Sequence, residues 1–254
     1  MHSTQPLNYV TQPGEQIMAL NALEHSRRPQ WLTFDCYGTL IQWDEGLQAA
    51  VRKILSAKQT EAIDPARFIS IYDRHEHALE QTSPHRSFRI VTADALRLTL
   101  DELGLQSDAD DARVLTDSIS AMPPFPEVIS ALERLKEAGY RLCIVSNTDD
   151  EIIAGNVAQL GGLIDRVVTA QQAGAYKPSR KIFDHAFNAL GVTRDDVVHI
   201  CASPHLDHAA AREVGFRCVW IDRGTGRTVL PDYTPDATLA TLDQVPVLFN
   251  RLGW

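Results

Sequence analysis

The stretch Leu32-Thr33-Phe34-Asp35-Cys36-Tyr37-Gly38-Thr39-Leu40 carries an apolar run to a single aspartate and then into a Gly-Thr turn. The apolar run predicts a buried strand, and Asp35 stands where that strand ends. A carboxylate held there by hydrogen-bond donors can attack an electrophilic carbon or phosphorus atom. The alternative is structural, because aspartate often caps a turn after a strand. The segment therefore predicts either a covalent nucleophile or a turn cap at Asp35.

Outward from this stretch, short β-rich runs alternate with helical stretches. The predicted strands cover residues 31–35, 141–145, 165–169, 197–201 and 217–221. The predicted helices cover residues 126–138, 150–160, 180–190 and 207–214, and a glycine follows each at or just past its end, where a left-handed residue is favoured. This alternation predicts an α/β fold, a doubly wound parallel sheet of the Rossmann-like type.

Residues 44–122 break the alternation, because they contain no convincing strand. They predict helices over residues 47–60, 65–81 and 87–103, with one more helix after the polar stretch 107–111. We therefore expect an inserted helical domain at 44–122 and an α/β core formed by 31–43 and 123–254. Residues 1–30 are polar and contain three prolines, so we expect a loose N-terminal extension there.

The amino-acid composition limits the classes of molecule that the protein could bind. The net charge is −9, from 33 acidic against 24 basic residues, which argues against nucleic acid or an anionic membrane surface as the main partner. A small anionic substrate is still compatible, because a local cluster of cations can override the global field. The four cysteines form no C-x-x-C pair, so we expect buried thiols in a reducing cytoplasm rather than disulfides or a zinc site. No apolar run reaches the length of a membrane span.

The string Asp35 to Leu40 resembles the first motif of the haloacid dehalogenase superfamily, whose members attack substrate through that aspartate. The family's phosphatases carry a second acid two residues later, where this chain has Tyr37. The sequence therefore resembles the branch that cleaves carbon–halide bonds, the type II 2-haloacid dehalogenases. The resemblance implies a helical cap at the insert, and it places Tyr37 and Thr39 of the first motif near the substrate.

Two further segments match the family's motifs. Ser146 and Asn147 end the second predicted strand; they either cap the next helix or hold the carboxylate of a substrate. Lys177 precedes Pro178 at a predicted helix start. It is either a surface residue or, as the resemblance implies, the cation that keeps Asp35 ionised and offsets charge during attack.

The fourth motif departs from the family pattern. Phosphatases bear two acids there that help to hold magnesium, whereas this chain has Ser203 and a single acid, Asp207. We therefore expect no cofactor, and Mg²⁺ only if the protein is a phosphatase. The dehalogenases carry Ser and Asn at the positions of Ala202 and Pro204, and Tyr at that of Phe183. The group that would activate water is therefore left open between Asp207 and His205.

The remaining candidates for site residues are histidines and residues of the helical insert. His199, His205 and His208 do not by themselves predict zinc; His205 is either a surface residue or a base that orients water. Dehalogenases grip the substrate with a cap arginine, and we take Arg74 as the candidate among Arg67, Arg74, Arg86 and Arg89. Trp43 is expected either as an apolar wall of the substrate site or as part of the core.

The leading hypothesis is a hydrolase resembling (S)-2-haloacid dehalogenases, in which Asp35 displaces halide through a covalent ester. Alternatives are a metal-dependent phosphatase, a hydrolase of another carboxylate electrophile such as a strained small ring, or a non-catalytic relative. A homodimer is the default expectation for such an enzyme.

Overall fold

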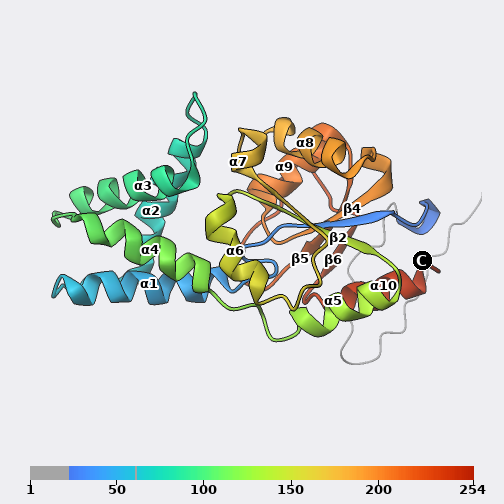
Figure 1. Cartoon of the computed structure of the whole chain (residues 1–254), viewed down its shortest axis with the longest axis horizontal. Coiled ribbons are helices and arrows are strands. Elements are labelled where there is room, and N and C mark those ends of the chain that lie inside the picture. The colour runs from blue at the N-terminus through green and yellow to red at the C-terminus, as the bar shows by residue number, and fades with distance from the viewer. Residues whose placement is uncertain (1–22, 61) are drawn as a thin grey trace, which may run out of the picture.

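A computed structural model describes residues 23–60 and 62–254, and its centre is a six-stranded parallel sheet (Figure 1). The order is β3-β2-β1-β4-β5-β6, which confirms the α/β prediction. The strands are β1 (Trp31–Phe34), β2 (Arg141–Ser146), β3 (Arg166–Thr169), β4 (Val197–Cys201), β5 (Arg217–Ile221) and β6 (Ala237–Leu239). β1 lies between β2 and β4, with Phe34 paired to Ile144 and Ile200. The residues that follow these three strands therefore meet at one edge of the sheet.

Helices cover both faces of this sheet. In Figure 1, α5 and α10 lie together below it, and α8 and α9 lie above it. The elements of this part are η1 (Leu23–His25), α5 (Val128–Glu137), α6 (Asp150–Ala158), α7 (Ala170–Ala173), α8 (Arg180–Leu190), η2 (Arg194–Asp196), η3 (Pro204–His208), α9 (Ala209–Val214) and α10 (Gln244–Arg251). The central strands β1, β2 and β4 are almost entirely buried between the two helical layers, as expected for a parallel sheet.

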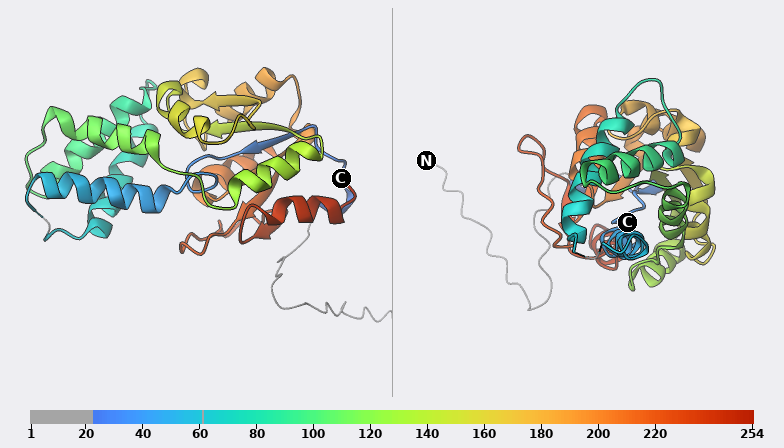
Figure 2. Two further views of the ribbon diagram at one scale, coloured as in Figure 1. Left: turned by 60° about the horizontal axis from the view of Figure 1, so that its bottom comes forward. Right: turned by 90° about the vertical axis from the view of Figure 1, so that its left-hand side faces the viewer.

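Four helices fill the stretch between β1 and α5 and extend beyond the end of the sheet (Figure 1; Figure 2, left). They are α1 (Trp43–Ala57), α2 (Pro65–Glu80), α3 (Phe88–Glu102) and α4 (Ala109–Ala121). Side chains cap three of their starts: Asp64 and Ser87 accept from backbone N–H groups, and Asp108 forms a capping box. That these helices act as a cap, with boundaries at 44 and 122, stays a prediction.

Two expectations about elements are corrected, and two further elements were missed. β6 and α10 were not predicted, because β6 has only three residues and α10 contains Pro246. The predicted helix 207–214 is in fact a π-helical turn, η3, followed by the short helix α9. Of the predicted loose extension, residues 1–22 lie outside the described residues, whereas residues 23–30 are attached to the core. Leu23 is fully buried, and Arg27 and Gln30 both bond to Asp196.

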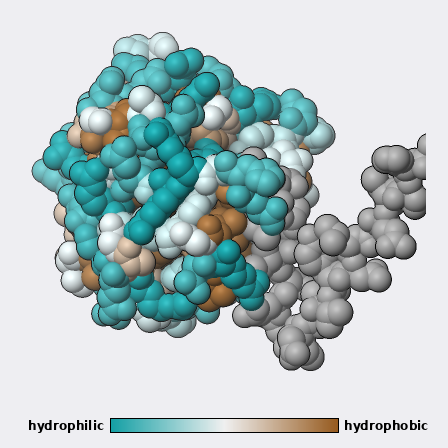
Figure 3. Space-filling model, turned by 90° about the vertical axis from the view of Figure 1, so that its right-hand side faces the viewer, coloured by the Kyte–Doolittle hydropathy of each residue, from teal (hydrophilic) through white to brown (hydrophobic). Residues whose placement is uncertain are grey.

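Large hydrophobic side chains are rarely exposed on the described part of the surface. The face shown in Figure 3 is mainly hydrophilic, with its hydrophobic side chains in separate patches. Among the described residues, only Ile90 and Val229 are large hydrophobic side chains that are exposed. The predicted homodimer therefore stays a prediction. In the part of the chain that the structure covers, no helix combines the length and apolar character needed to cross a membrane.

Candidate active site

Asp35 stands directly after β1, where a tight turn directs the chain back over the end of the sheet. Its N–H donates to Ile200 O (3.0 Å), which continues the pairing with β4. The turn then reverses through Gly38, whose φ of +82° lies in the left-handed region that glycine adopts without strain. A side chain at Gly38 would also meet Arg227, since a Cβ built there lies 2.9 Å from the guanidinium.

Two hydrogen bonds fix the Asp35 carboxylate. Thr39 Oγ1 donates to Asp35 Oδ2 (2.7 Å), and Lys177 Nζ donates to Oδ1 (3.0 Å). The Thr39 hydroxyl in turn accepts from Ala202 N (2.8 Å). Thr39 is fully buried and does not line the cavity described below, so its predicted role as a substrate contact is corrected. It orients Asp35 instead.

Lys177 links Asp35 to Asp207. Its Nζ lies 2.8 Å from Asp207 Oδ1, and both side chains are fully buried. Burial lowers the pKa of Lys177, but the two carboxylates outweigh this and raise it above its ordinary value. Burial raises the pKa of Asp207, but Lys177 and His199 outweigh it and bring that pKa down to about 2. The centre therefore consists of two carboxylates and one ammonium, of which Lys177 and Asp207 are ionised at neutral pH.

His199 extends this chain of contacts into the sheet. Its Nε2 lies 3.0 Å from Asp207 Oδ1, and its Nδ1 lies 2.9 Å from Thr33 Oγ1. An ionised carboxylate only accepts, so Nε2 carries a proton. Phe183 stacks edge-on against the imidazole, with the ring centroids 5.3 Å apart. These contacts leave Asp207 Oδ2 as the one atom of that carboxylate that is buried without a partner.

The two polar residues after β2 have different tasks. Asn147 Oδ1 accepts from Lys177 N (2.7 Å), and its Nδ2 donates to Lys177 O (3.3 Å) and Glu80 Oε2 (3.2 Å). The amide of Asn147 therefore holds the lysine backbone. Ser146 Oγ is buried without a hydrogen-bond partner among the described residues and lies on the cavity.

A cavity of about 700 Å³ opens over these strand ends. From the core its lining includes Asp35, Tyr37, Ser146, Asn147, Ser203, Pro204, His205, Leu206, Thr225 and Arg227. From the helices between β1 and α5 it includes Trp43, Asp44, Leu47, Gln48, Ala66, Ile69, Ser70, Asp73, Glu76, His77, Glu80 and Phe88. The structure thus brings most of the sequence-predicted site residues to one cavity.

Tyr37 and Trp43 form an aromatic corner of this cavity, with ring centroids 5.2 Å apart. The Tyr37 hydroxyl donates to Asn156 Oδ1 (2.9 Å), and Asn156 Nδ2 donates to Ile119 O and Met122 O. Burial raises the pKa of Tyr37 well above its ordinary value. The Tyr37 hydroxyl therefore already donates its proton in a hydrogen bond to Asn156. It is a poor general acid for protonating a leaving group.

The prediction for Arg74 is corrected. Its guanidinium makes two 2.7 Å hydrogen bonds to Glu102 on α3 and is largely exposed. None of the four candidate arginines lines the cavity, and the arginine that does is Arg227, in the segment after β5, paired with Asp44 at 2.9 Å. Sequence reasoning missed Arg227 because it lies outside the insert in which a cap arginine was sought.

Three acids of α2, which the sequence did not single out, face the cavity. Glu76 and Glu80 are more than nine-tenths buried, and Asp73 is half-buried. Burial is the main reason that the pKa of Glu76 rises to about 8, that of Asp73 to about 6, and that of Glu80 well above its ordinary value. Tyr72 donates to Glu76 (2.6 Å), but among the described residues no lysine or arginine pairs with any of the three.

His205 lies at the side of the cavity formed by η3, and His77 lies on α2. Burial and then His205 lower the pKa of His77. His205, on the core side, is therefore close enough to act electrostatically on His77 of the helical insert. Both line the cavity.

The residues do not fit the magnesium site of the phosphatase alternative. The Lys177 ammonium lies within 3.0 Å of both Asp35 and Asp207, the two carboxylates that would have to hold the ion. Ser203 stands where a further acid would be needed, so Mg²⁺ would lack one of the carboxylates on which such a site is built.

Comparison with known proteins agrees with this geometry. The model of the haloacid dehalogenase-like hydrolases matches residues 30–215. Haloacetate dehalogenase H-2 of Moraxella sp. (strain B) is 28% identical over 222 residues, covering 84% of this chain and 95% of the relative. An (S)-2-haloacid dehalogenase of Pseudomonas sp. (strain YL) is 29% identical over 228 residues, covering 86% and 94%.

Among solved structures, the L-2-haloacid dehalogenase of Xanthobacter autotrophicus with chloropropionic acid covalently bound matches with a TM-score of 0.75. The identity is 19%, and the match covers 87% of this chain and 98% of that one, so it bears on the fold. The parallel α/β sheet and the family match together define the class of this protein as a hydrolase with an α/β fold. The chain belongs to the haloacid dehalogenase-like hydrolase family.

Proposed function

We propose that this protein hydrolyses a small carboxylate substrate by nucleophilic attack of Asp35 on carbon, with a 2-halo acid as the first candidate. One observation carries the proposal: the Asp35 carboxylate lies on the cavity, held by Thr39 and Lys177, while the position of a phosphatase's acid is filled by Tyr37. The names of the relatives reported above support the same substrate class.

In the first step an Asp35 oxygen forms a bond to C2 of the substrate, and the C2–halogen bond breaks with release of halide. Lys177 stabilises the arrangement, because its ammonium balances the charge of Asp35 and Asp207 in a site removed from water. The Ser146 hydroxyl, buried and without a partner, is the group we assign to the substrate carboxylate.

In the second step water attacks Cγ of the Asp35 ester and the bond between Cγ and the ester oxygen breaks. The substrate alkoxide that leaves takes up a proton and is released as the 2-hydroxy acid, while the oxygen of water stays in the Asp35 carboxylate. Asp207 is ionised with a pKa of about 2, so it is a weak base and serves chiefly to hold Lys177. His205 lines the cavity and is the residue we assign to accepting the water proton. The reaction written in this way needs no cofactor.

The test is halide release from racemic 2-chloropropionate in the presence of a chelator. Wild type and Asp101→Asn, a surface control on α3, are expected to release halide, and Asp35→Asn is not. Single turnover in heavy-oxygen water should place the label in the peptide that contains Asp35. Halide release by Asp35→Asn at the wild-type rate, or label found only in the product, would refute the nucleophile.

A second candidate follows from the acidic wall of α2. A purely anionic substrate would face Asp73, Glu76 and Glu80, while the arginine on the cavity, Arg227, is already paired with Asp44. An ammonium group on the substrate would instead return Glu76 and Glu80 to their ionised forms. This favours a substrate with both a carboxylate and an amine, either a 2-halo amino acid or a strained cyclic amino acid. In the cyclic substrate, an Asp35 oxygen bonds to a ring carbon and that carbon's bond to the ring ammonium breaks, which leaves a free amine on the same molecule.

Two substrates separate the candidates: 2-chlorobutanoate and 4-amino-2-chlorobutanoate, which differ by the amine. If α2 binds an ammonium, kcat/KM should favour the amine by about tenfold or more, since about 1.4 kcal/mol corresponds to a factor of ten. Glu80→Gln should remove that preference, while Glu102→Gln, an exposed control, should keep it. Equal or weaker use of the amine by wild type would reject the second candidate and leave the first.

The cytoplasmic location expected from the sequence stays a prediction.

A further inference from the structure

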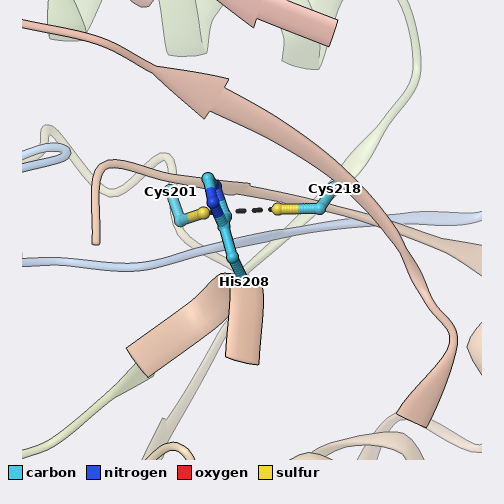
Figure 4. Close-up of side chains that lie close together, drawn as sticks. All are labelled: Cys201, His208 and Cys218. Atoms are coloured by element: carbon cyan, nitrogen blue, oxygen red, sulfur yellow. Dashed lines mark hydrogen bonds between the residues drawn. The ribbon is translucent and has the colours of Figure 1, made fainter. Parts of the chain in front are cut away.

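A second cluster of chemically active side chains lies behind the active site, between β4 and β5. It consists of Cys201 at the end of β4, Cys218 in β5 and His208 at the end of η3, and all three are fully buried. The two sulfurs are 3.4 Å apart, and one donor atom from each residue lies within 4.8 Å of the others. In Figure 4 the two thiols point toward each other from their strands, and the imidazole stands beside the line that joins them.

The imidazole is the observation that distinguishes this cluster from ordinary core packing. Both ring nitrogens of His208 are buried, and among the described residues neither makes a hydrogen bond to nitrogen or oxygen; the group with which the imidazole interacts is the Cys218 thiol. Buried polar groups are nearly always paired, so an imidazole whose one neighbour of this kind is a thiol has room for a further ligand. His199 provides the contrast, because both of its nitrogens are bonded, to Thr33 and Asp207.

We propose that Cys201, Cys218 and His208 form a binding site for a thiophilic divalent cation, with zinc as the fitting ion. Thiolate and imidazole are the ligands that zinc prefers, and three protein ligands leave one position for water. Two thiolates on a tetrahedral zinc with bonds of about 2.3 Å lie about 3.8 Å apart, so the sulfurs here need to separate by only a few tenths of an ångström.

Binding replaces two thiol protons. Zn²⁺ forms bonds to both sulfurs and to one nitrogen of His208, and the two protons pass to solvent. The surroundings already hold the ligands in place. Asp236 accepts from Cys218 N (2.7 Å) and donates its own N–H to Cys218 O (2.9 Å), while Trp220 and Tyr233 pack against the imidazole ring. Entry would follow opening of the irregular segment 222–236, which carries Tyr233.

The site would be structural and separate from the attack on substrate. His208 directly follows Asp207, and both belong to the π-helical turn η3. An ion that joins His208 to β4 and β5 would therefore fix the turn that presents Asp207 to Lys177. This does not depend on whether the substrate is a halo acid.

The experiment uses the reduced full-length protein and titrates it with cobalt(II), then with zinc in competition with a chromophoric chelator. Wild type should bind one ion per chain and show thiolate-to-cobalt charge-transfer absorption, and zinc should displace the cobalt and raise Tm. Cys143→Ser, which alters another fully buried thiol in β2, should behave like wild type. Cys218→Ser and His208→Gln should lose the absorption and the rise in Tm.

Absence of binding by reduced wild type would overturn the proposal, and so would charge-transfer bands that persist in both ligand variants. Quantitative formation of a Cys201–Cys218 disulfide without metal binding would also overturn it and assign the cluster to thiol chemistry. Circular dichroism monitors folding of the variants. If they do not fold, the wild-type stoichiometry and the Cys143→Ser control decide the outcome.

Discussion

At the scale of single residues, the site depends on one buried lysine. Lys177 has no exposed surface and lies between two carboxylates, so its ammonium is the counter-charge of both. Removing one partner of a buried ion pair leaves uncompensated charge and costs about 3–5 kcal/mol. The same removal also takes away the charge that stabilises the attack, an effect of about a hundredfold to a thousandfold in kcat for preorganised donors.

We therefore predict that Lys177→Met lowers the free energy of unfolding by about 3–5 kcal/mol and nearly abolishes turnover. Urea denaturation at neutral pH measures the first effect and the halide assay the second. Lys181→Met, an exposed lysine on α8, serves as the control and should change neither. A Lys177→Met protein as stable as wild type would show that water or another group screens the two carboxylates.

At the scale of elements, α3 is held to the core through its first turn. The Asp149 carboxylate, just before α6, accepts from Phe88 N (2.8 Å) and Arg89 N (2.9 Å). A carboxylate at a helix N-terminus satisfies free N–H groups and opposes the positive end of the helix dipole. Asp149 therefore joins the helical insert to the strand ends beside the cavity.

We predict that Asp149→Ala lowers the free energy of unfolding by about 1–2 kcal/mol, as loss of a helix cap does, and loosens the start of α3. Hydrogen–deuterium exchange should rise over residues 81–90, with Glu133→Gln, an exposed acid of α5, unchanged. Unaltered exchange in Asp149→Ala would mean that Tyr176, whose hydroxyl donates to Arg86 O (2.9 Å), holds the segment alone.

The elements also show which parts of the site a sequence reveals. Asp35, Ser146 and Lys177 follow apolar runs or precede a proline, so their place at the strand ends can be predicted. The position of the α2 acids in the site could not be predicted in this way. Helical periodicity shows which residues share a face of a helix but not which part of the protein that face contacts. Glu76 and Glu80 follow Tyr72 at four-residue spacing, yet acids are expected in solvent until the fold places α2 over the cavity. The cluster of Cys201 and Cys218 likewise exists only once β4 pairs with β5.

At the scale of the whole molecule, the buried acids give opposite contributions to stability as pH changes. Asp207 has a lowered pKa, so its contribution is present above 3.8 and is lost as pH falls toward about 2. Glu76 has a raised pKa, so between 4.5 and about 8 the folded protein binds more protons than the unfolded chain. In that interval the ionisation of Glu76 therefore lowers the free energy of unfolding as pH rises.

We therefore predict that Glu76→Gln, which cannot ionise, gains stability relative to wild type as pH rises from 4.5 to about 8. The gain has an upper limit of about 1.4 kcal/mol per pH unit, because one unit of pKa corresponds to that free energy. Urea denaturation of both proteins across this interval measures the difference, and Glu102→Gln, at an exposed position, should run parallel to wild type. Parallel curves for Glu76→Gln would mean that Glu76 is ionised in the folded protein. In that case the wall of α2 already contains a charge for which an ammonium substrate would be the natural partner.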